Sequence, residues 1–184
     1  GKTVLLDDLK PTAQRSGWHW VGTDLSESAS ISEKALVIRL LTDLSLVTSS
    51  IPYSISSERS IGFSSEEKQR EHNLTYEALS AYYDNTAGLV SDKIKAVLSL
   101  VWRYLSSTDR RGIIFAYDEA QNLADHSEKD EYPLSTLLDV FQSIQKQGIP
   151  FMLVLAGLPT LYPKLVEART YSERMFHVIM LDRL

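Results

Sequence analysis

The sequence predicts an α/β fold in which helices cover both faces of a mostly parallel sheet, a three-layer α/β/α arrangement. Two strand-like segments, 112–117 and 149–156, are almost continuously apolar, as expected of strands buried on both faces. Amphipathic segments with helical periodicity alternate with them, which is typical of βα units with right-handed crossovers. Ligands of such sheets bind beyond the carboxyl ends of the strands, so we expect functional residues just after positions 117 and 156.

Composition supports one globular domain and excludes several classes of protein. The chain has 184 residues, of which 43% are hydrophobic and 23% charged, enough for a full core with or without an insertion. It has no cysteine, which excludes a disulfide scaffold or a thiolate zinc site and fits a cytoplasmic location. The net charge of −5 argues against direct nucleic-acid binding. No apolar run is long enough to span a bilayer.

The first third of the chain is predicted to form two helices and a short strand. A helix is expected over 4–14, with Gly17 as its terminator, followed by a strand that begins at Trp18. The segment 32–47 repeats apolar residues every three or four positions and begins with Ser32, a favourable N-cap, so it is predicted to be an amphipathic helix.

The segment 48–75 differs from its surroundings because serine is dense and apolar residues are sparse. We interpret it as a surface insertion, with a short strand near 61–63. The remaining elements alternate in type, in this order: helices over 76–83 and 91–107, a strand over 112–117, a helix over 133–148 with Pro133 in its first turn and Gly148 as its C-cap, a strand over 149–156, a helix over 160–169 and a third apolar strand over 174–181.

The chain opens with Gly1-Lys2-Thr3, which corresponds to the end of the phosphate loop G-x-x-x-x-G-K-[ST]. These residues start a predicted helix, where backbone N–H groups and the helix dipole favour phosphate. On this interpretation the first strand and the glycine-rich turn precede Gly1. Lys2 is then expected to neutralise the β- and γ-phosphates, and Thr3 to place its hydroxyl on Mg²⁺.

Asp118 and Glu119 follow the apolar segment 113–117, at the predicted tip of a strand. This sequence resembles a Walker B motif, in which the first carboxylate holds Mg²⁺ through water and the second orients and deprotonates the attacking water. Two solvated acids in a loop are the structural alternative. The presence of Gly1-Lys2-Thr3 upstream favours the functional interpretation.

Three later features have weaker signals. The tip after 149–156 carries Gly157, with Thr160 shortly after it, where a polar sensor of the γ-phosphate would lie; a simple Gly-Pro turn explains these residues as well. Arg174 is either an arginine finger that reaches the nucleotide of a neighbouring subunit or a surface residue paired with Glu173 or Asp182. His19, between two tryptophans, is interpreted as part of a half-buried strand and not as a base-stacking platform.

Taken in order, the segments GKT, IIFAYDEAQNL, LVLAGLPTLYPKL and SERMF resemble the nucleotide-binding core of an AAA+ type P-loop ATPase. The most similar group is that of bacterial and archaeal origin-recognition, signal-transducing and transposition-helper ATPases. The resemblance covers most of 1–184 apart from 48–90, and implies a partial AAA+ core whose first strand and C-terminal helical lid lie outside the given chain. The tip at Gly157 lacks the Asn or Asp that the family often uses as a sensor.

The resemblance implies ATP and Mg²⁺ as ligands and assigns a role to each site residue. Gly1, Lys2 and Thr3 would bind the phosphates. Thr3 and Asp118 would bind Mg²⁺. Glu119 would be the catalytic base, and Arg174 an arginine finger acting in trans, which requires self-association.

Three functions remain open at this point. The first is Mg²⁺-dependent ATP binding with hydrolysis that drives a conformational change. The second is a nucleotide-gated interaction switch with negligible turnover, whose state a protein partner reads. The third is a DNA-linked helper ATPase for replication or transposition, with any DNA contact indirect. No membrane partner is expected.

Overall fold

The computed structural model describes residues 1–25, 32–49, 51–54 and 71–181, and has an α/β fold. Three parallel strands form an open sheet in the order β1-β4-β5. These strands are β1 (Trp18–Val21), β4 (Gly112–Tyr117) and β5 (Phe151–Leu155). The predicted class and the parallel pairing of the two apolar strands are therefore confirmed, although β5 is shorter than the segment predicted.

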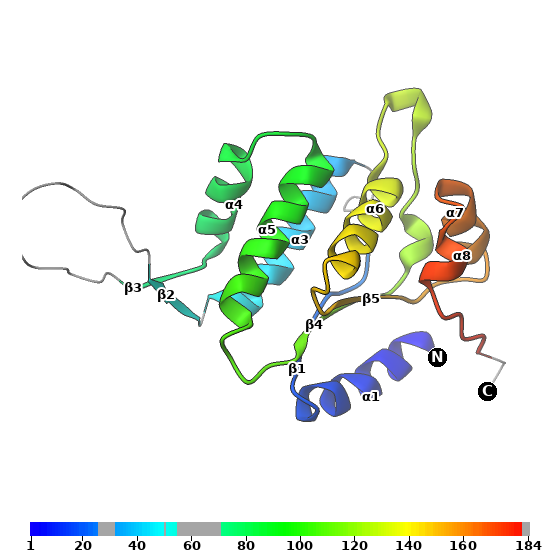
Figure 1. Cartoon of the computed structure of the whole chain (residues 1–184). Coiled ribbons are helices and arrows are strands. Elements are labelled where there is room, and N and C mark those ends of the chain that lie inside the picture. The colour runs from blue at the N-terminus through cyan, green and yellow to red at the C-terminus, as the bar shows by residue number, and fades with distance from the viewer. Residues whose placement is uncertain (26–31, 50, 55–70, 182–184) are drawn as a thin grey trace, which may run out of the picture.

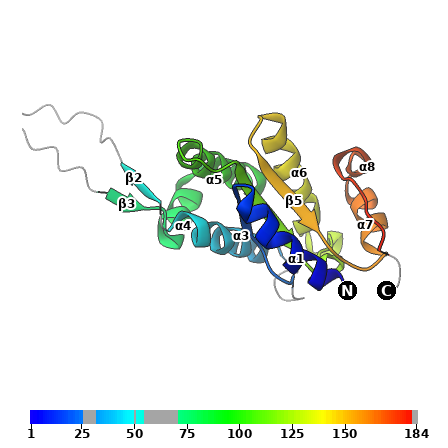
Figure 2. The ribbon, with the colours of Figure 1, turned by 90° about the horizontal axis from the view of Figure 1, so that it is seen from below.

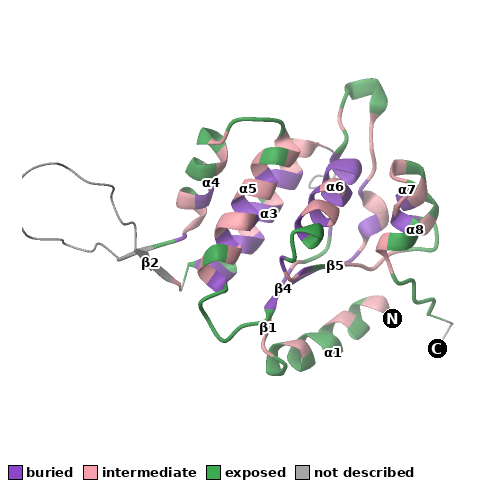
Figure 3. Cartoon of the chain, viewed as in Figure 1, coloured by how far each residue is buried: buried purple, intermediate pink, exposed green. Residues whose placement is uncertain are grey.

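Helices lie on both faces of this sheet but cover them unequally (Figures 1 and 2). One face is covered by α3 (Glu33–Thr48), α5 (Val90–Leu105) and α6 (Pro133–Lys146), with α4 (Tyr76–Asn85) packed outside α3 and α5. On the opposite face lies α1 (Lys2–Arg15), which has no buried residue. Figure 3 shows the buried residues gathered between the sheet and the first group of helices. No helix in the described part of the chain is long and apolar enough to cross a membrane.

The core forms where the amphipathic patterns predict it. The buried residues of α5 share one face of the helix: Ile94, Val97, Leu98, Val101 and Leu105. Phe115 of β4 meets Phe141 of α6 edge-on, with ring centroids 5.2 Å apart, and Phe151 of β5 at 5.9 Å. Burying such side chains contributes about 1.5–3 kcal/mol each, so this face of β4 is rigidly held.

The helix-end signals are borne out with one shift. The Ser32 hydroxyl accepts a hydrogen bond from the Ala35 N–H over 3.1 Å and caps α3. Pro133 lies in the first turn of α6, as predicted. The C-cap of α6 is Gln147, and Gly148 follows it with φ +74°, so the glycine stands one position beyond the cap predicted for it.

The predicted insertion begins and ends in a small sheet of its own. The strands β2 (Pro52–Ser54) and β3 (Glu71–Asn73) pair antiparallel, away from the main sheet (Figure 1). The strand predicted near 61–63 lies outside the described residues.

The prediction of a third apolar strand over 174–181 is wrong. The short helix α8 (Ser172–Met175) takes up its start, and residues 176–181 have no regular structure. Ile179 and Met180 are each 71% exposed. A strand needs a neighbour for its backbone hydrogen bonds, and within the described ranges no strand pairs with this segment. Apolar composition alone therefore did not make it a strand.

Candidate functional site

The candidate site lies where β4 ends and α1 begins. Thr3 Oγ1 donates a hydrogen bond to Asp118 Oδ2 over 2.5 Å, which joins residues 115 positions apart. Gly1 is the N-cap of α1 and provides no side-chain cap, so the first N–H groups of this helix are available to an anion. The structure thus brings together the two segments that the sequence selected separately.

Asp118 is held firmly in place. Asp118 is only 3% exposed. One carboxylate oxygen, Oδ2, accepts from Thr3, and the other, Oδ1, accepts from the Glu119 N–H over 2.8 Å. A buried carboxylate without donors would be strongly destabilising, and these two donors satisfy it. The Asp118 carboxylate is therefore not one of two solvated acids in a loop. Its two oxygens are nearly buried and fixed at the end of a strand, which suits the coordination of a ligand.

The loop after β1 supports Asp118 from the other side. The Leu25 N–H donates to the Asp118 carbonyl over 2.9 Å, and the parallel pairing extends to Asp24, opposite Asp118. Gly22 makes this approach possible: its φ is +117°, and a Cβ there would lie 2.0 Å from the Ala116 carbonyl oxygen. Only glycine fits this backbone without a shift.

Glu119 adopts a left-handed backbone conformation, with φ 50° and ψ 34°. Such a conformation costs a non-glycine residue on the order of 1–3 kcal/mol and is enriched at functional sites. Lys2 Nζ lies 3.8 Å from Glu119 Oε1, with side-chain exposures of 27% and 44%. An exposed ion pair of this length contributes little to stability. Its significance is that it places the lysine beside the candidate base.

The sequence reasoning missed Gln121, which lies in the 3₁₀ turn η1 (Ala120–Asn122). Its Nε2 donates to Glu119 Oε2 over 2.5 Å, and its Oε1 accepts from the Leu158 N–H over 3.0 Å. Residue type and position gave no signal for this role, because it depends on the reversal of the chain at Glu119.

The tip of β5 contacts the candidate site through its backbone and not through a polar side chain at Gly157 or Thr160. The Ala120 N–H donates to the Ala156 carbonyl over 2.9 Å, so η1 is attached to the end of β5. Gly157 lies against the carboxamide of Gln121, and Thr160 is an exposed residue that begins α7 (Leu161–Ala168) without capping it through its side chain. Within this part of the described structure, neither Gly157 nor Thr160 provides the polar sensor.

Arg174 is not brought to this cluster. It is exposed on α8 and lines a hollow of about 510 Å³ with Gln142, Gln145 and Lys146 near the end of α6. Tyr171 and Met175 also line this hollow, and none of its lining residues belongs to the cluster around Thr3 and Asp118. Among the described residues Arg174 forms no ion pair with Glu173, and Asp182 lies outside them.

Arg174 is nevertheless attached to α6 through its neighbours in the chain. The guanidinium of Arg169 makes a bidentate pair with Asp139 of α6, at 2.9 and 2.7 Å, and the Tyr171 hydroxyl donates to the same carboxylate. Burial raises the pKa of Asp139, but the hydrogen bonds from Arg169 and Tyr171 outweigh it, and the pKa is lowered overall. The segment that carries Arg174 is therefore held by a charged network.

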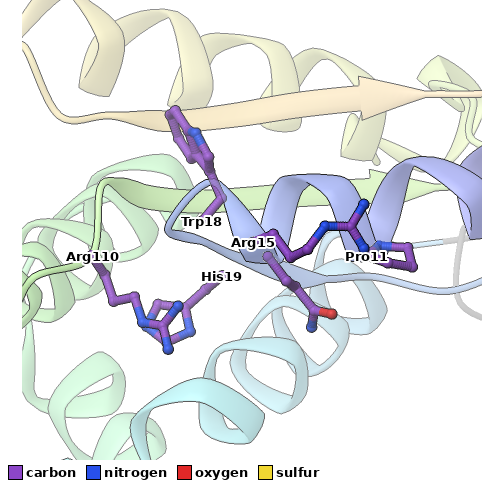
Figure 4. A pocket seen from close by; sticks show the side chains of 6 residues that line it. Pro11, Arg15, Trp18, His19 and Arg110 are labelled. Atoms are coloured by element: carbon purple, nitrogen blue, oxygen red, sulfur yellow. The ribbon is translucent and has the colours of Figure 1, made fainter.

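A second hollow, of about 460 Å³, lies at the start of β1 and is lined by α1 and by the loop before β4 (Figure 4). Its side chains include Arg15, Trp18, His19 and Arg110. Burial, and then the charge of Arg110, lower the pKa of His19. All residues of β1 up to Trp20 are half-buried, in agreement with the structural interpretation of His19.

The side chains of the candidate site could hold a metal ion only together with ligands that the protein does not provide, such as phosphate oxygens and water. In the described ranges no group of three or more His, Cys, Asp or Glu side chains could hold a metal. Thr3 and Asp118 offer adjacent hard oxygens. Mg²⁺ typically takes one or two protein ligands and completes its shell with phosphate oxygens and water. The donor set therefore fits a magnesium–nucleotide complex better than a free metal ion.

A comparison of the chain with protein-family models, curated proteins and solved structures found no match. Functional inference therefore depends on the geometry of the site itself.

Proposed function

We propose that the protein binds ATP in a Mg²⁺-dependent manner and hydrolyses it to drive a conformational change. The observation that carries the proposal is the contact of Thr3 with Asp118, flanked by the Lys2–Glu119 pair. Four residues chosen for separate roles, on the start of one helix and the end of one strand, form one cluster. Chance placement of two unrelated motifs would not be expected to produce this.

Each residue has a chemical task in the proposal. Lys2 and the first N–H groups of α1 bind the phosphates, as at other helix N-termini. Thr3 and Asp118 hold Mg²⁺, which supplies positive charge to the phosphate oxygens. Glu119 accepts a proton from the attacking water as the water oxygen bonds to the γ-phosphorus. The bond from that phosphorus to the bridging oxygen breaks, and ADP leaves with the electron pair.

The wider assignment to the AAA+ type P-loop ATPases, in the cytoplasm, is part of the same proposal. The exposure of Arg174 on α8, outside the cluster around Thr3 and Asp118, supports an arginine finger that acts on a neighbouring subunit's nucleotide. Self-association would then be needed for full activity. DNA would stimulate the protein only indirectly.

A nucleotide-gated switch with negligible turnover is the second candidate, and one observation favours it. Both carboxylate oxygens of Glu119 already have partners, Lys2 at Oε1 and Gln121 at Oε2. A base held by two donors is less able to accept a proton. If nucleotide binding did not release Lys2, the bound state would persist and a protein partner would read it.

The test is ATP binding by the full-length protein, measured by calorimetry with Mg²⁺ and with EDTA. Lys2→Ala should abolish binding, because Lys2 is the lysine beside the candidate phosphate site. Lys10→Ala is the matched control, an exposed lysine further along the same helix, and should bind as the wild type does. Equal binding by wild type and Lys2→Ala would contradict the proposal. A single-turnover assay then separates an ATPase from a switch that retains its nucleotide.

A further inference from the structure

Gln121 connects the candidate base to the loop after β5. In addition to its side-chain bonds with Glu119 and Leu158, its backbone carbonyl accepts a hydrogen bond from Lys164 Nζ of α7 over 2.8 Å. The carboxamide therefore lies between the segments that follow two neighbouring strands and is held at both ends, while Lys164 holds the backbone of the same residue. This is an extensive set of contacts for a half-buried glutamine.

The two groups that the Gln121 side chain contacts fix the orientation of its amide. A carboxylate such as Glu119 can only accept, and the Leu158 N–H can only donate. Residue 121 must therefore donate with one end and accept with the other. A glutamate at 121 could accept from Leu158 but would place a second carboxylate against Glu119, and an alanine could do neither.

The glycine at 157 makes room for this arrangement. A Cβ at Gly157 would lie 2.8 Å from Gln121 Oε1 and 3.3 Å from the Gln121 backbone nitrogen. The space where a side chain at the tip of β5 would project is thus occupied by the carboxamide of Gln121. Position 157 has no polar side chain of its own, and the carboxamide of Gln121, two residues after Glu119, provides a polar group there.

We propose that Gln121 is a positioning residue for Glu119, an inference that deepens the proposed function and rests on it. Its amide holds Glu119 Oε2 and leaves Oε1 to accept the proton of water once Lys2 has turned to the phosphates. Through Leu158, the same amide ties the orientation of the base to the loop after β5. Gln121 thereby takes the place of a sensor side chain on that loop.

The first test is a kinetic cycle on the full-length protein with four forms: wild type, Gln121→Ala, Glu119→Gln and the double variant. Gln121→Ala should lower kcat about tenfold to a hundredfold, the scale of a misplaced catalytic group, while KM and the Kd for ATP change less than about twofold. Unchanged ATP affinity also shows that the variant folds. In the Glu119→Gln background the same substitution should have no further effect, because Gln121 acts through Glu119.

The second test compares Gln121→Glu, which preserves the length of the side chain, with Gln121→Ala. Glutamate at 121 can still accept from the Leu158 N–H but cannot donate to Glu119 as the amide does, so Gln121→Glu should lower kcat at least as much as Gln121→Ala. If Gln121 merely stabilised the loop after β5, Gln121→Glu would restore kcat, and this result would overturn the inference. Gln147→Ala, an exposed glutamine at the end of α6, is the matched control and should leave kcat unchanged.

The outcomes separate this inference from the proposed function. If Glu119→Gln slows turnover while Gln121→Ala does not, the inference is overturned and the ATPase proposal stands. Equal losses from Gln121→Ala in both backgrounds would also overturn it, because the two residues would then act independently. If Glu119→Gln turns over as fast as wild type, the proposed base is wrong and this inference falls with it.

Discussion

The Thr3 hydroxyl donates to the Asp118 carboxylate across 2.5 Å, and this single contact joins the start of α1 to the end of β4. The helix buries no residue of its own against the sheet, so polar contacts at its first turn help to fix where it begins. Because the proposed phosphate and metal ligands lie on either side of this contact, it is the structural centre of the site.

Thr3→Val tests the metal role of this contact, because valine keeps the shape of threonine and removes the hydroxyl. We expect ATP binding in Mg²⁺ to weaken about tenfold or more relative to the wild type, the scale of a lost hydrogen bond to a charged group. The weaker binding in EDTA should be the same for the variant and the wild type. Thr12→Val, on the exposed side of the same helix, is the control. Equal weakening with and without Mg²⁺, measured by calorimetry, would exclude a metal role for Thr3.

Gly22→Ala tests the close approach of the β1 loop to β4. The new Cβ would meet the Ala116 backbone at 2.0 Å with φ at +117°, so we expect a loss of roughly 3 kcal/mol or more in the free energy of unfolding. At Gly148→Ala, φ is also positive, at +74°, but nothing lies within 4 Å, and a loss of about 1 kcal/mol is expected. Urea denaturation measures both. Equal losses would show that the contact with Ala116 is not the cause.

Tyr117→Phe tests a buried polar group directly beneath the site. The hydroxyl of Tyr117, which is 0% exposed, donates to Asp43 Oδ2 over 2.8 Å, and Arg39 pairs with the same carboxylate. At neutral pH the variant should lose about 1–3 kcal/mol, because a buried carboxylate loses a donor. The expected loss is one of stability, with nucleotide binding affected only through folding.

The same variant gives a prediction for alkaline pH. Burial, the charge of Asp43 and the hydrogen bond to it raise the pKa of Tyr117 well above its ordinary value. The native protein thus keeps this proton where the unfolded chain has lost it, so stability present below about pH 10 declines as the pH rises further. Tyr117→Phe has no hydroxyl to ionise here, so its free energy of unfolding does not decline for this reason. The difference in the free energy of unfolding between wild type and variant should therefore narrow above about pH 10. Tyr82→Phe, at a residue 40% exposed, should show no such change; a constant gap for Tyr117→Phe would contradict the assignment.

Local sequence signals predicted the elements whose formation depends on neighbours in the chain. The cap at Ser32, the apolar face of α5 and the continuous apolar strand 112–117 all appear in the structure. Asp118 and Glu119 were found because a strand tip in a parallel sheet is a defined place for ligands. In these cases the pattern and the structure share one physical cause, the burial of a regular face.

Features that depend on distant partners could not be predicted in this way. The segment 174–181 is as apolar as a strand but has no pairing partner within the described residues. The role of Gln121 requires the left-handed turn at Glu119 and the nearness of Gly157, neither of which leaves a periodic signal. The pairing of Asp43 with Tyr117 spans 74 positions, and only its partner Arg39, one helical turn away, could have been noticed in the sequence.

The measurement that tests the central claim most directly is steady-state ATP turnover by the full-length protein beside Glu119→Gln, with and without duplex DNA. We predict that Glu119→Gln binds ATP as the wild type does and turns over slower by about a hundredfold or more, the scale of a lost general base. A rise in wild-type turnover with DNA would favour the DNA-linked helper. Turnover of Glu119→Gln equal to that of wild type would contradict the assignment of Glu119 as the base and the account of the site built on it.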